Sequence, residues 1–338
     1  MKAAVYQGSR RFTVEEIETP EPGPGQVLVK VTHSAICGTD VHAFMYDIAK
    51  PGSVIGHEIA GVIAAVGPDV ERWQVGERVV AGGGRPPDGR GGLVAANPRY
   101  NYRTMGFAGS VNGGYAEYQR LPEWRPTRVP DGVPDAAAAL TEPCSVAVHA
   151  VRRSAVRTGD TVAVIGAGPI GLLVMQVARA AGAGRLIVSE PAPARADAAR
   201  RLGAHAVINP REEEPVARIV ELAGGAGADV VFDCAGIGAT LDQALDATRP
   251  AGQVVLVAVP WEPLSLEPAN WMAREVDLRV SFASEPEDWH RALALMASGR
   301  ISAAALISET SFIALEQIQE TFEALTAPST QLQVVIRL

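Results

Sequence analysis

The first 81 residues alternate apolar and polar positions in short runs, which is the period of half-buried β-strands. Proline and glycine separate these runs, as in PEPGPG at 20–25. The pattern predicts strands at 1–6, 12–17, 26–36, 59–67 and 76–81, and a further strand at 115–122. Residues 81–114 are rich in Gly, Arg and Pro and keep no period, so we expect a long surface loop there. The chain therefore begins as a β-rich unit.

The period changes after residue 135. The sequence predicts a helix from Asp135 to Glu142, a break at Pro143 and a second helix. Strands separated by helical patterns are then expected at 161–165, 185–190, 204–210, 228–236 and 251–260. Short apolar runs of this kind are typical of a parallel sheet that is covered on both faces.

The tail, 286–338, predicts helices at 287–299 and 314–325 and a closing strand at 332–338. We expect an α/β fold in which a β-rich domain, 1–145, precedes a doubly wound parallel-sheet domain, 146–285. The tail is expected to return to the first domain. Two units also agree with the length of 338 residues, which is long for a single core.

Composition excludes several classes of protein. The net charge of −8 is diffuse, with no basic block, so a nucleic acid partner is not expected. The three cysteines do not form a disulfide framework, and the N-terminus has a strand pattern in place of a signal peptide, so we expect a cytoplasmic protein. No membrane partner is expected either. The nearly uncharged stretch 161–184 is long enough to span a bilayer, but glycines and a proline interrupt its first third.

A dinucleotide-binding pattern lies within that stretch. It consists of a turn with the G-x-G-x-x-G spacing, formed by Gly166, Gly168, Pro169, Ile170 and Gly171. The turn follows a predicted strand and opens a helix, an arrangement that binds a pyrophosphate at the helix N-terminus. A tight turn without a ligand is the alternative.

Two residues, one at the end of the next predicted strand and one after it, bear on the choice of cofactor. Glu190 ends that strand about 20 residues after the glycines, where a carboxylate accepts hydrogen bonds from ribose hydroxyls and repels a 2′-phosphate. It favours NAD over NADP. Arg195 could stack on the adenine, meet a phosphate or remain solvated.

Candidate metal ligands occur in three separate segments. Cys37 lies in AICGTDVHAF, His57 and Glu58 lie in GHEIAGVIAAVG, and Glu142 lies in TEPC. Zinc binds thiolate, imidazole and carboxylate together, and three protein ligands with one open position are typical of a catalytic site. The spacing does not decide the matter, since a core His57 with a surface Glu58 remains an alternative.

These segments resemble the medium-chain, zinc-dependent alcohol dehydrogenase superfamily over essentially the whole chain. The residues that carry the resemblance are CGTDVH (37–42), GHEIAGVIAAVG (56–67), VGERVV (75–80), GGYAEY (113–118), TEPCSVAVHAV (141–151) and VAVIGAGPIGLL (162–173). The resemblance implies a GroES-like catalytic domain and a Rossmann domain. Within the superfamily the chain most resembles the 2,3-butanediol and sorbitol (polyol) dehydrogenase branch.

The resemblance also implies a zinc site. Cys37 and His57 match the family's zinc ligands, and Glu142 stands at the position of the third protein ligand. Glu58 or a water takes part instead in the polyol branch. Asp40 is similar to the carboxylate that orients the ligating histidine, a partner that metal-bound imidazoles generally have.

The resemblance assigns catalytic roles near Cys37 as well. Thr39 and His42 match the family's proton relay, in which Thr39 takes the alcohol proton and passes it through the cofactor ribose to His42. With Glu58 they form the expected catalytic set. The implied reaction is hydride transfer between NAD and a small secondary alcohol, a vicinal diol or polyol, to give a ketone.

One family feature is missing from the sequence. Many members bind a second, structural zinc through four cysteines in the segment that corresponds to 81–114, which contains no cysteine here. We therefore expect one zinc per chain. The resemblance separately implies a homodimer or homotetramer. The alternatives are a zinc-free quinone or enoyl reductase of the same fold, and a non-catalytic NAD-binding protein.

Overall fold

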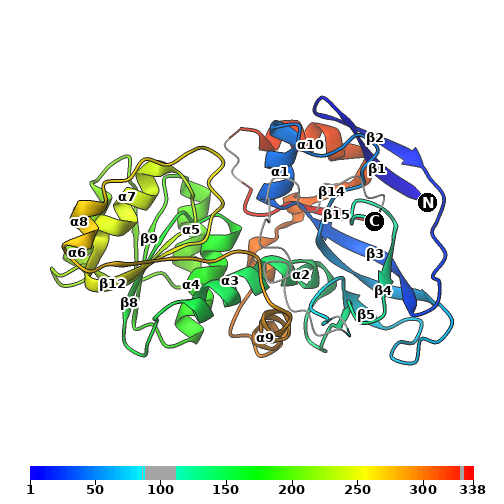
Figure 1. The fold of residues 1–338 in the computed structure, drawn as a ribbon, viewed down its shortest axis with the longest axis horizontal. Helices are drawn as coiled ribbons and strands as arrows, with labels where there is room; N and C mark the ends of the chain where they lie inside the picture. The colour runs from blue at the N-terminus through cyan, green and yellow to red at the C-terminus, as the bar shows by residue number, and fades with distance from the viewer. Residues whose placement is uncertain (86, 88–111, 328–330) are drawn as a thin grey trace. The chain divides into compact units, whose positions relative to one another are not determined.

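The computed structural model describes residues 1–85, 87, 112–327 and 331–338 (Figure 1). Contacts divide the chain into two units. Unit 1 consists of Met1–Glu142, Glu285–Ala297 and Ile307–Leu338, and unit 2 consists of Pro143–Ser284 and Ser298–Leu306. The predicted loop 81–114 falls largely outside the described residues.

Unit 1 is rich in antiparallel strands. β1 (Lys2–Gly8) pairs with β2 (Arg11–Glu16), and a second sheet has the order β14-β15-β3-β4-β5-β7, with β6 added to β3. The strands of the second sheet are β3 (Gln26–Ala35), β4 (Glu58–Val66), β5 (Arg78–Val80), β6 (Tyr118–Pro122), β7 (Thr127–Arg128), β14 (Phe312–Ala314) and β15 (Val335–Arg337). Each strand predicted in the first 81 residues overlaps an observed strand, because the alternation places one set of side chains in the core.

The helices of unit 1 include one that the sequence pattern does not predict. The α-helices are α1 (Gly38–Met45), α2 (Asp135–Ala139), α9 (Pro286–Ala297) and α10 (Ile318–Leu325), with 3₁₀ turns at η3 (Glu309–Ser311) and η4 (Leu315–Gln317). α1 has only eight residues. A helix of that length is marginal alone and depends on tertiary packing.

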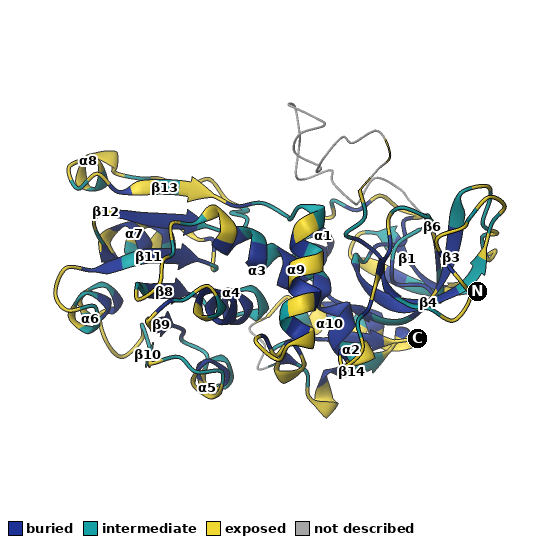
Figure 2. Cartoon of the chain, turned by 90° about the horizontal axis from the view of Figure 1, so that it is seen from below, coloured by how far each residue is buried: buried dark blue, intermediate teal, exposed yellow. Residues whose placement is uncertain are grey.

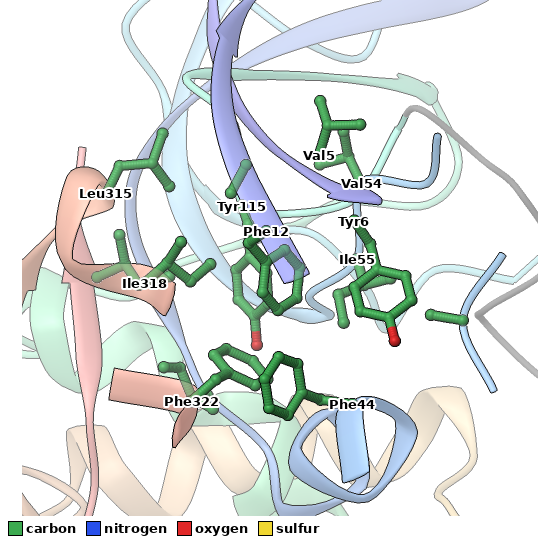
Figure 3. Close-up of a cluster of buried hydrophobic side chains, with 14 of the residues drawn as sticks. Val5, Tyr6, Phe12, Phe44, Val54, Ile55, Tyr115, Leu315, Ile318 and Phe322 are labelled. Carbon is green, nitrogen blue, oxygen red and sulfur yellow. The ribbon is translucent and has the colours of Figure 1, made fainter. Parts of the chain in front are cut away.

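Aromatic packing supplies the tertiary support for α1. Phe44 on α1 stacks on Phe12 of β2, with ring centroids 5.8 Å apart, and lies 5.4 Å from Phe322 of α10. Figure 3 shows these rings gathered in one buried cluster with Tyr6 and Tyr115. Burial of each aromatic side chain stabilises the cluster by about 2 to 3 kcal/mol. The packing fixes the helix that begins immediately after Cys37.

The predicted helix break at Pro143 is wrong. α2 ends earlier, with Leu140 as its C-cap, and α3 (Thr141–Arg153) runs through Pro143 without interruption. Pro143 is the third residue of α3. A proline is tolerated there because the first-turn N–H groups of a helix have no intrahelical partner.

Unit 2 contains the doubly wound sheet that the sequence predicts. Six parallel strands have the order β10-β9-β8-β11-β12-β13. They are β8 (Thr161–Ile165), β9 (Arg185–Ser189), β10 (Ala206–Ile208), β11 (Ala228–Asp233), β12 (Thr248–Leu256) and β13 (Asp277–Val280). The order reverses between β8 and β11, the position at which open α/β sheets bind ligands. The edge strand β13 is largely exposed and is not predicted by the apolar pattern.

Helices cover this sheet, as Figure 2 shows. They are α4 (Pro169–Ala180), α5 (Pro193–Arg201), α6 (Pro215–Leu222), α7 (Gly238–Ala247) and α8 (Pro268–Met272), followed by the 3₁₀ turn η2 (Ala304–Leu306). Every residue of β8 after Thr161 is buried, as expected of a strand covered on both faces. Within the ranges that the structure describes, no helix combines the length and apolarity needed to cross a membrane.

Candidate functional site

The first candidate site lies in unit 1, where β3 gives way to α1 and where β4 begins. Cys37 precedes α1, and His57 and Glu58 stand at the start of β4. One ligand atom from each of these three residues lies within 4.8 Å of the others. The strands pair antiparallel with Ala35 opposite Glu58, so the sheet register brings Cys37 to the His57–Glu58 segment. The structure thus gathers residues from two separate sequence segments.

Asp40 lies behind the histidine. Its carboxylate is fully buried, and its Oδ1 lies 3.4 Å from Nδ1 of His57. Burial lowers the pKa of His57, but the negative charges of Asp40 and Cys37 outweigh that effect, and the pKa is raised well above its usual value. The His57 side chain remains 39% exposed, so the ring is not enclosed.

The donor set fits a divalent cation. Burial raises the pKa of the Cys37 thiol to about 11, although His57 lowers it. Burial also raises the pKa of Glu58, and the charge of Glu142 raises it further. The Cys37 thiol and the Glu58 carboxyl group, held close together, therefore both resist ionisation. A bound cation reverses this preference, because it favours the deprotonated ligands.

Glu142 lies outside the group of three close ligand atoms. It is the second residue of α3, and burial raises its pKa. The charges of His57 and Asp40 also act on it, which indicates that its carboxylate is near the group. Its role as third zinc ligand stays a prediction, as does the alternative role of Glu58.

The predicted relay residues flank Cys37 on α1. The Thr39 hydroxyl donates a hydrogen bond to Cys37 Sγ at 3.0 Å. Nδ1 of His42 lies 2.7 Å from the Gly38 carbonyl oxygen, which can only accept, so Nδ1 carries a proton and Nε2 can act as a base. Burial lowers the pKa of His42, which favours the neutral ring. The order in which these groups pass a proton stays a prediction.

Two residues near the ligand group have no role in the sequence analysis. Gln333, just before β15, is buried and donates hydrogen bonds to the Ile36 carbonyl at 3.0 Å and to Oε2 of Glu58 at 3.3 Å. The Tyr115 hydroxyl donates to Oδ2 of Asp40 at 2.7 Å. A polar side chain within an apolar closing strand was the only sequence signal for Gln333. Tyr115 lies in GGYAEY, which carries the resemblance but implied no function for it.

The second candidate site lies in unit 2, at the turn between β8 and α4. Gly166 has φ +90°, a conformation that favours glycine. A Cβ on Gly171 would lie 1.8 Å from the Gly166 carbonyl oxygen, so glycine is required for the helix to approach the strand. Gly168 is the N-cap of α4, whose first two residues are Pro169 and Ile170. A Cβ on Gly168 would meet no atom within 4 Å. The backbone is therefore open there to a phosphate group.

Glu190 accepts a hydrogen bond from the backbone of this turn. It follows β9 and is buried, with Oε2 accepting from the Ala167 N–H at 2.7 Å and Oε1 accepting from the Ala192 N–H at 2.8 Å. Glu190 also lines a cavity of about 200 Å³ together with Asp197 and Glu212. Arg195 lies on α5, and its Nε is buried without a hydrogen-bond partner among the described residues. Both residues stay predicted cofactor contacts.

Comparison with known proteins identifies relatives over the whole chain. A model described as the alcohol dehydrogenase GroES-like domain matches residues 23–131, and one described as zinc-binding dehydrogenase matches 169–298. The (R,R)-butanediol dehydrogenase of Bacillus subtilis is 33% identical over 350 residues, covering 100% of this chain and 99% of the relative. The sorbitol dehydrogenase of the same organism is 32% identical over 344 residues, covering 96% and 93%.

A solved structure agrees with these relatives. A protein from Sinorhizobium meliloti 1021 that has been assigned as a zinc-binding dehydrogenase, and whose structure holds NADP, superimposes with a TM-score of 0.88 at 30% identity, covering 100% of this chain and 99% of that one. The predicted GroES-like and Rossmann fold is thereby confirmed. The chain therefore belongs to the medium-chain, zinc-dependent alcohol dehydrogenase superfamily, whose members are zinc-containing, nicotinamide-dependent dehydrogenases that act on CH–OH groups.

Proposed function

We propose that this enzyme oxidises a secondary alcohol to a ketone with NAD, and that its substrate is a vicinal diol or polyol. The observation that carries the proposal is the group formed by Cys37, His57 and Glu58, whose ligand atoms lie within 4.8 Å of one another. The similarity to butanediol and sorbitol dehydrogenases supports the substrate class. Overall, the alcohol carbon loses a hydride to NAD and its hydroxyl loses a proton, which yields a ketone, NADH and H⁺.

The zinc would be held by Cys37, His57 and one carboxylate, Glu142 or Glu58. When bound there, zinc lowers the pKa of a coordinated hydroxyl group, as it does that of water. A thiolate and a carboxylate together balance its two positive charges. We propose that the interval 81–114, which has no cysteine, binds no second zinc.

Side chains of the protein would carry the proton away from the alcohol. Thr39 is positioned beside Cys37 by its hydrogen bond to Sγ, so its hydroxyl is close to the ligand group. We propose that Thr39 accepts the alcohol proton as it releases its own hydroxyl proton, and that Nε2 of His42 is the final acceptor of the relay, since Nδ1 already carries the proton donated to the Gly38 carbonyl.

The preference for NAD over NADP is also part of the proposal. A buried carboxylate at Glu190 and the carboxylates of Asp197 and Glu212 line the same cavity, and a 2′-phosphate there would meet this negative charge. Arg200 lines the cavity too, but it is paired with Asp197 at 2.8 Å. The NADP-bound relative means that the superfamily as a whole does not require NAD.

A substrate panel tests the proposed reaction. With NAD and a zinc-replete enzyme, 2,3-butanediol or a polyol such as sorbitol or xylitol should have a kcat/KM at least about 100-fold above that of ethanol. The reason is that a buried polar site discriminates strongly against a substrate that lacks the matching hydroxyl. The measurement is NADH absorbance with ethanol, 2-butanol, the 2,3-butanediol stereoisomers, sorbitol, xylitol and threonine.

Two cysteine variants provide the control. Cys37→Ala should lose zinc and turnover but keep NAD binding, whereas Cys234→Ala, in unit 2, should keep all three. Best activity on ethanol would contradict the diol and polyol assignment. Full turnover by a zinc-free Cys37→Ala enzyme would contradict the zinc mechanism.

A further inference from the structure

Tyr115 and Asp40 form a buried hydrogen bond behind the ligand group. The Tyr115 hydroxyl donates to Oδ2 of Asp40 at 2.7 Å, and both side chains are 0% exposed. Within the described part of the chain, the other donor to Oδ2 is the Cys37 N–H, at the longer distance of 3.3 Å. Among the described residues, Tyr115 is therefore the closest hydrogen-bond donor to this buried carboxylate, and burying a polar group is costly unless it is hydrogen-bonded.

The opposite oxygen of Asp40 faces the histidine. Oδ1 lies 3.4 Å from Nδ1 of His57 and has no hydrogen-bond partner among the described residues. The carboxylate can rotate unless something holds Oδ2. The Tyr115 hydroxyl makes the shorter of the two hydrogen bonds that hold Oδ2, the other coming from the Cys37 N–H, and so helps to keep Oδ1 directed at the His57 ring.

The Tyr115 ring is itself held against the segment that carries His57. The backbone N–H of Tyr115 donates to the Ile55 carbonyl at 3.0 Å, and Gly114 donates to Gly56 at 2.9 Å. Gly56 has φ +98°, and a Cβ at this position would lie 2.6 Å from the Tyr115 ring. The ring therefore packs directly on the backbone that precedes His57, and a side chain at residue 56 would displace it.

We propose that Tyr115 is a positioning residue for the metal site, whose hydroxyl fixes Asp40 and, through Asp40, the orientation of the His57 imidazole. The inference rests on the proposed zinc site. Carboxylate partners of metal-bound histidines typically change metal affinity by about 10- to 100-fold when they are mutated. A residue that holds such a carboxylate should act in the same direction, toward the smaller end of that range.

The test compares two tyrosines of one cluster. Tyr6 also donates its hydroxyl to an aspartate, Asp47, and Figure 3 shows both rings in the same group of buried side chains. Tyr115→Phe should weaken zinc binding about 10-fold, measured by competition with a chromophoric chelator in the full-length protein. Tyr6→Phe removes an equivalent bond away from the ligand group and should leave zinc affinity within about twofold of wild type.

Cobalt substitution supplies a second readout that a loss of general stability would not change. The visible spectrum of Co²⁺ in Tyr115→Phe should shift from that of wild type, since the His57 ligand is reoriented, whereas Tyr6→Phe should match wild type. Equal zinc affinity and equal spectra in both variants would overturn the inference. If the wild-type protein binds no zinc, the proposed function is wrong. If the wild-type protein binds zinc, but no more tightly than Tyr115→Phe does, only the inference about Tyr115 is wrong.

Two unnatural residues test the bond if Tyr115→Phe does not fold. 4-Aminophenylalanine at position 115 keeps a donor at the ring tip, and 4-methylphenylalanine fills a similar volume without one. The amino variant should retain zinc about 10-fold more tightly than the methyl variant. Identical affinities in these two variants would show that Tyr115 acts only by filling space.

Discussion

Among individual residues, Glu190 combines a buried negative charge with two backbone hydrogen bonds, one of them to Ala167 in the glycine turn. Glu190→Gln removes the charge and leaves only one oxygen to accept. We expect the KM for NAD to rise about 10-fold, since a hydrogen bond to a charged group contributes roughly 1.5 to 3 kcal/mol. The ratio of kcat/KM for NAD to that for NADP should fall, because the repulsion of a 2′-phosphate is reduced.

Asp197→Asn is the control for the effect of Glu190 on the KM for NAD, because it removes a carboxylate from the same cavity but does not contact the glycine turn. It should leave the KM for NAD within about twofold. Steady-state kinetics with both cofactors measure these effects. An unchanged cofactor ratio in Glu190→Gln would mean that another residue selects NAD.

At the scale of an element, different glycines of the β8–α4 turn are needed for folding and for binding of NAD. Gly171→Ala should lower the free energy of unfolding by about 3 kcal/mol, because its Cβ would collide with the Gly166 carbonyl. Gly168→Ala has open space around its Cβ and should cost less than about 1 kcal/mol. It should still weaken NAD binding, because the methyl group occupies the space that a pyrophosphate would approach.

Urea unfolding and NAD titration of these two glycine variants separate the effects. The expected pattern is a stability loss in Gly171→Ala and a selective affinity loss in Gly168→Ala. A Gly168→Ala enzyme that binds NAD normally would contradict a phosphate site at this turn.

At the scale of the whole molecule, the candidate zinc site and the candidate NAD site belong to different units. Removing zinc should therefore destabilise only the unit that binds it. The metal ligands lie in unit 1, and the glycine turn lies in unit 2. Wild type should contain one zinc per chain, and chelation should destabilise unit 1 by roughly 2.7 kcal/mol if free zinc had been 100 times its Kd. Hydrogen exchange by mass spectrometry should accelerate in β3 and β4 but not in β8 and β9. Equal acceleration in both units, or two zincs per chain, would contradict this assignment.

The sequence by itself determined the features that depend on local pattern. Alternation along 26–36 and 59–67 predicts β3 and β4, because a strand with one buried face must repeat every two residues. The short apolar runs predict the parallel sheet, and the spacing of Gly166, Gly168 and Gly171 predicts the turn that the structure contains. The metal ligands could be assigned only from the family resemblance, because spacing alone was also compatible with a buried structural His57 and a surface Glu58.

Only the tertiary structure decided what holds the ligand group in place. α1 is too short to form without the aromatic cluster around Phe44, so its pattern could not predict it. The Tyr115–Asp40 bond joins residues 75 positions apart, and the Gln333–Glu58 bond joins residues 275 apart. Such contacts follow from strand pairing and side-chain packing, because no local period relates residues so distant in the chain.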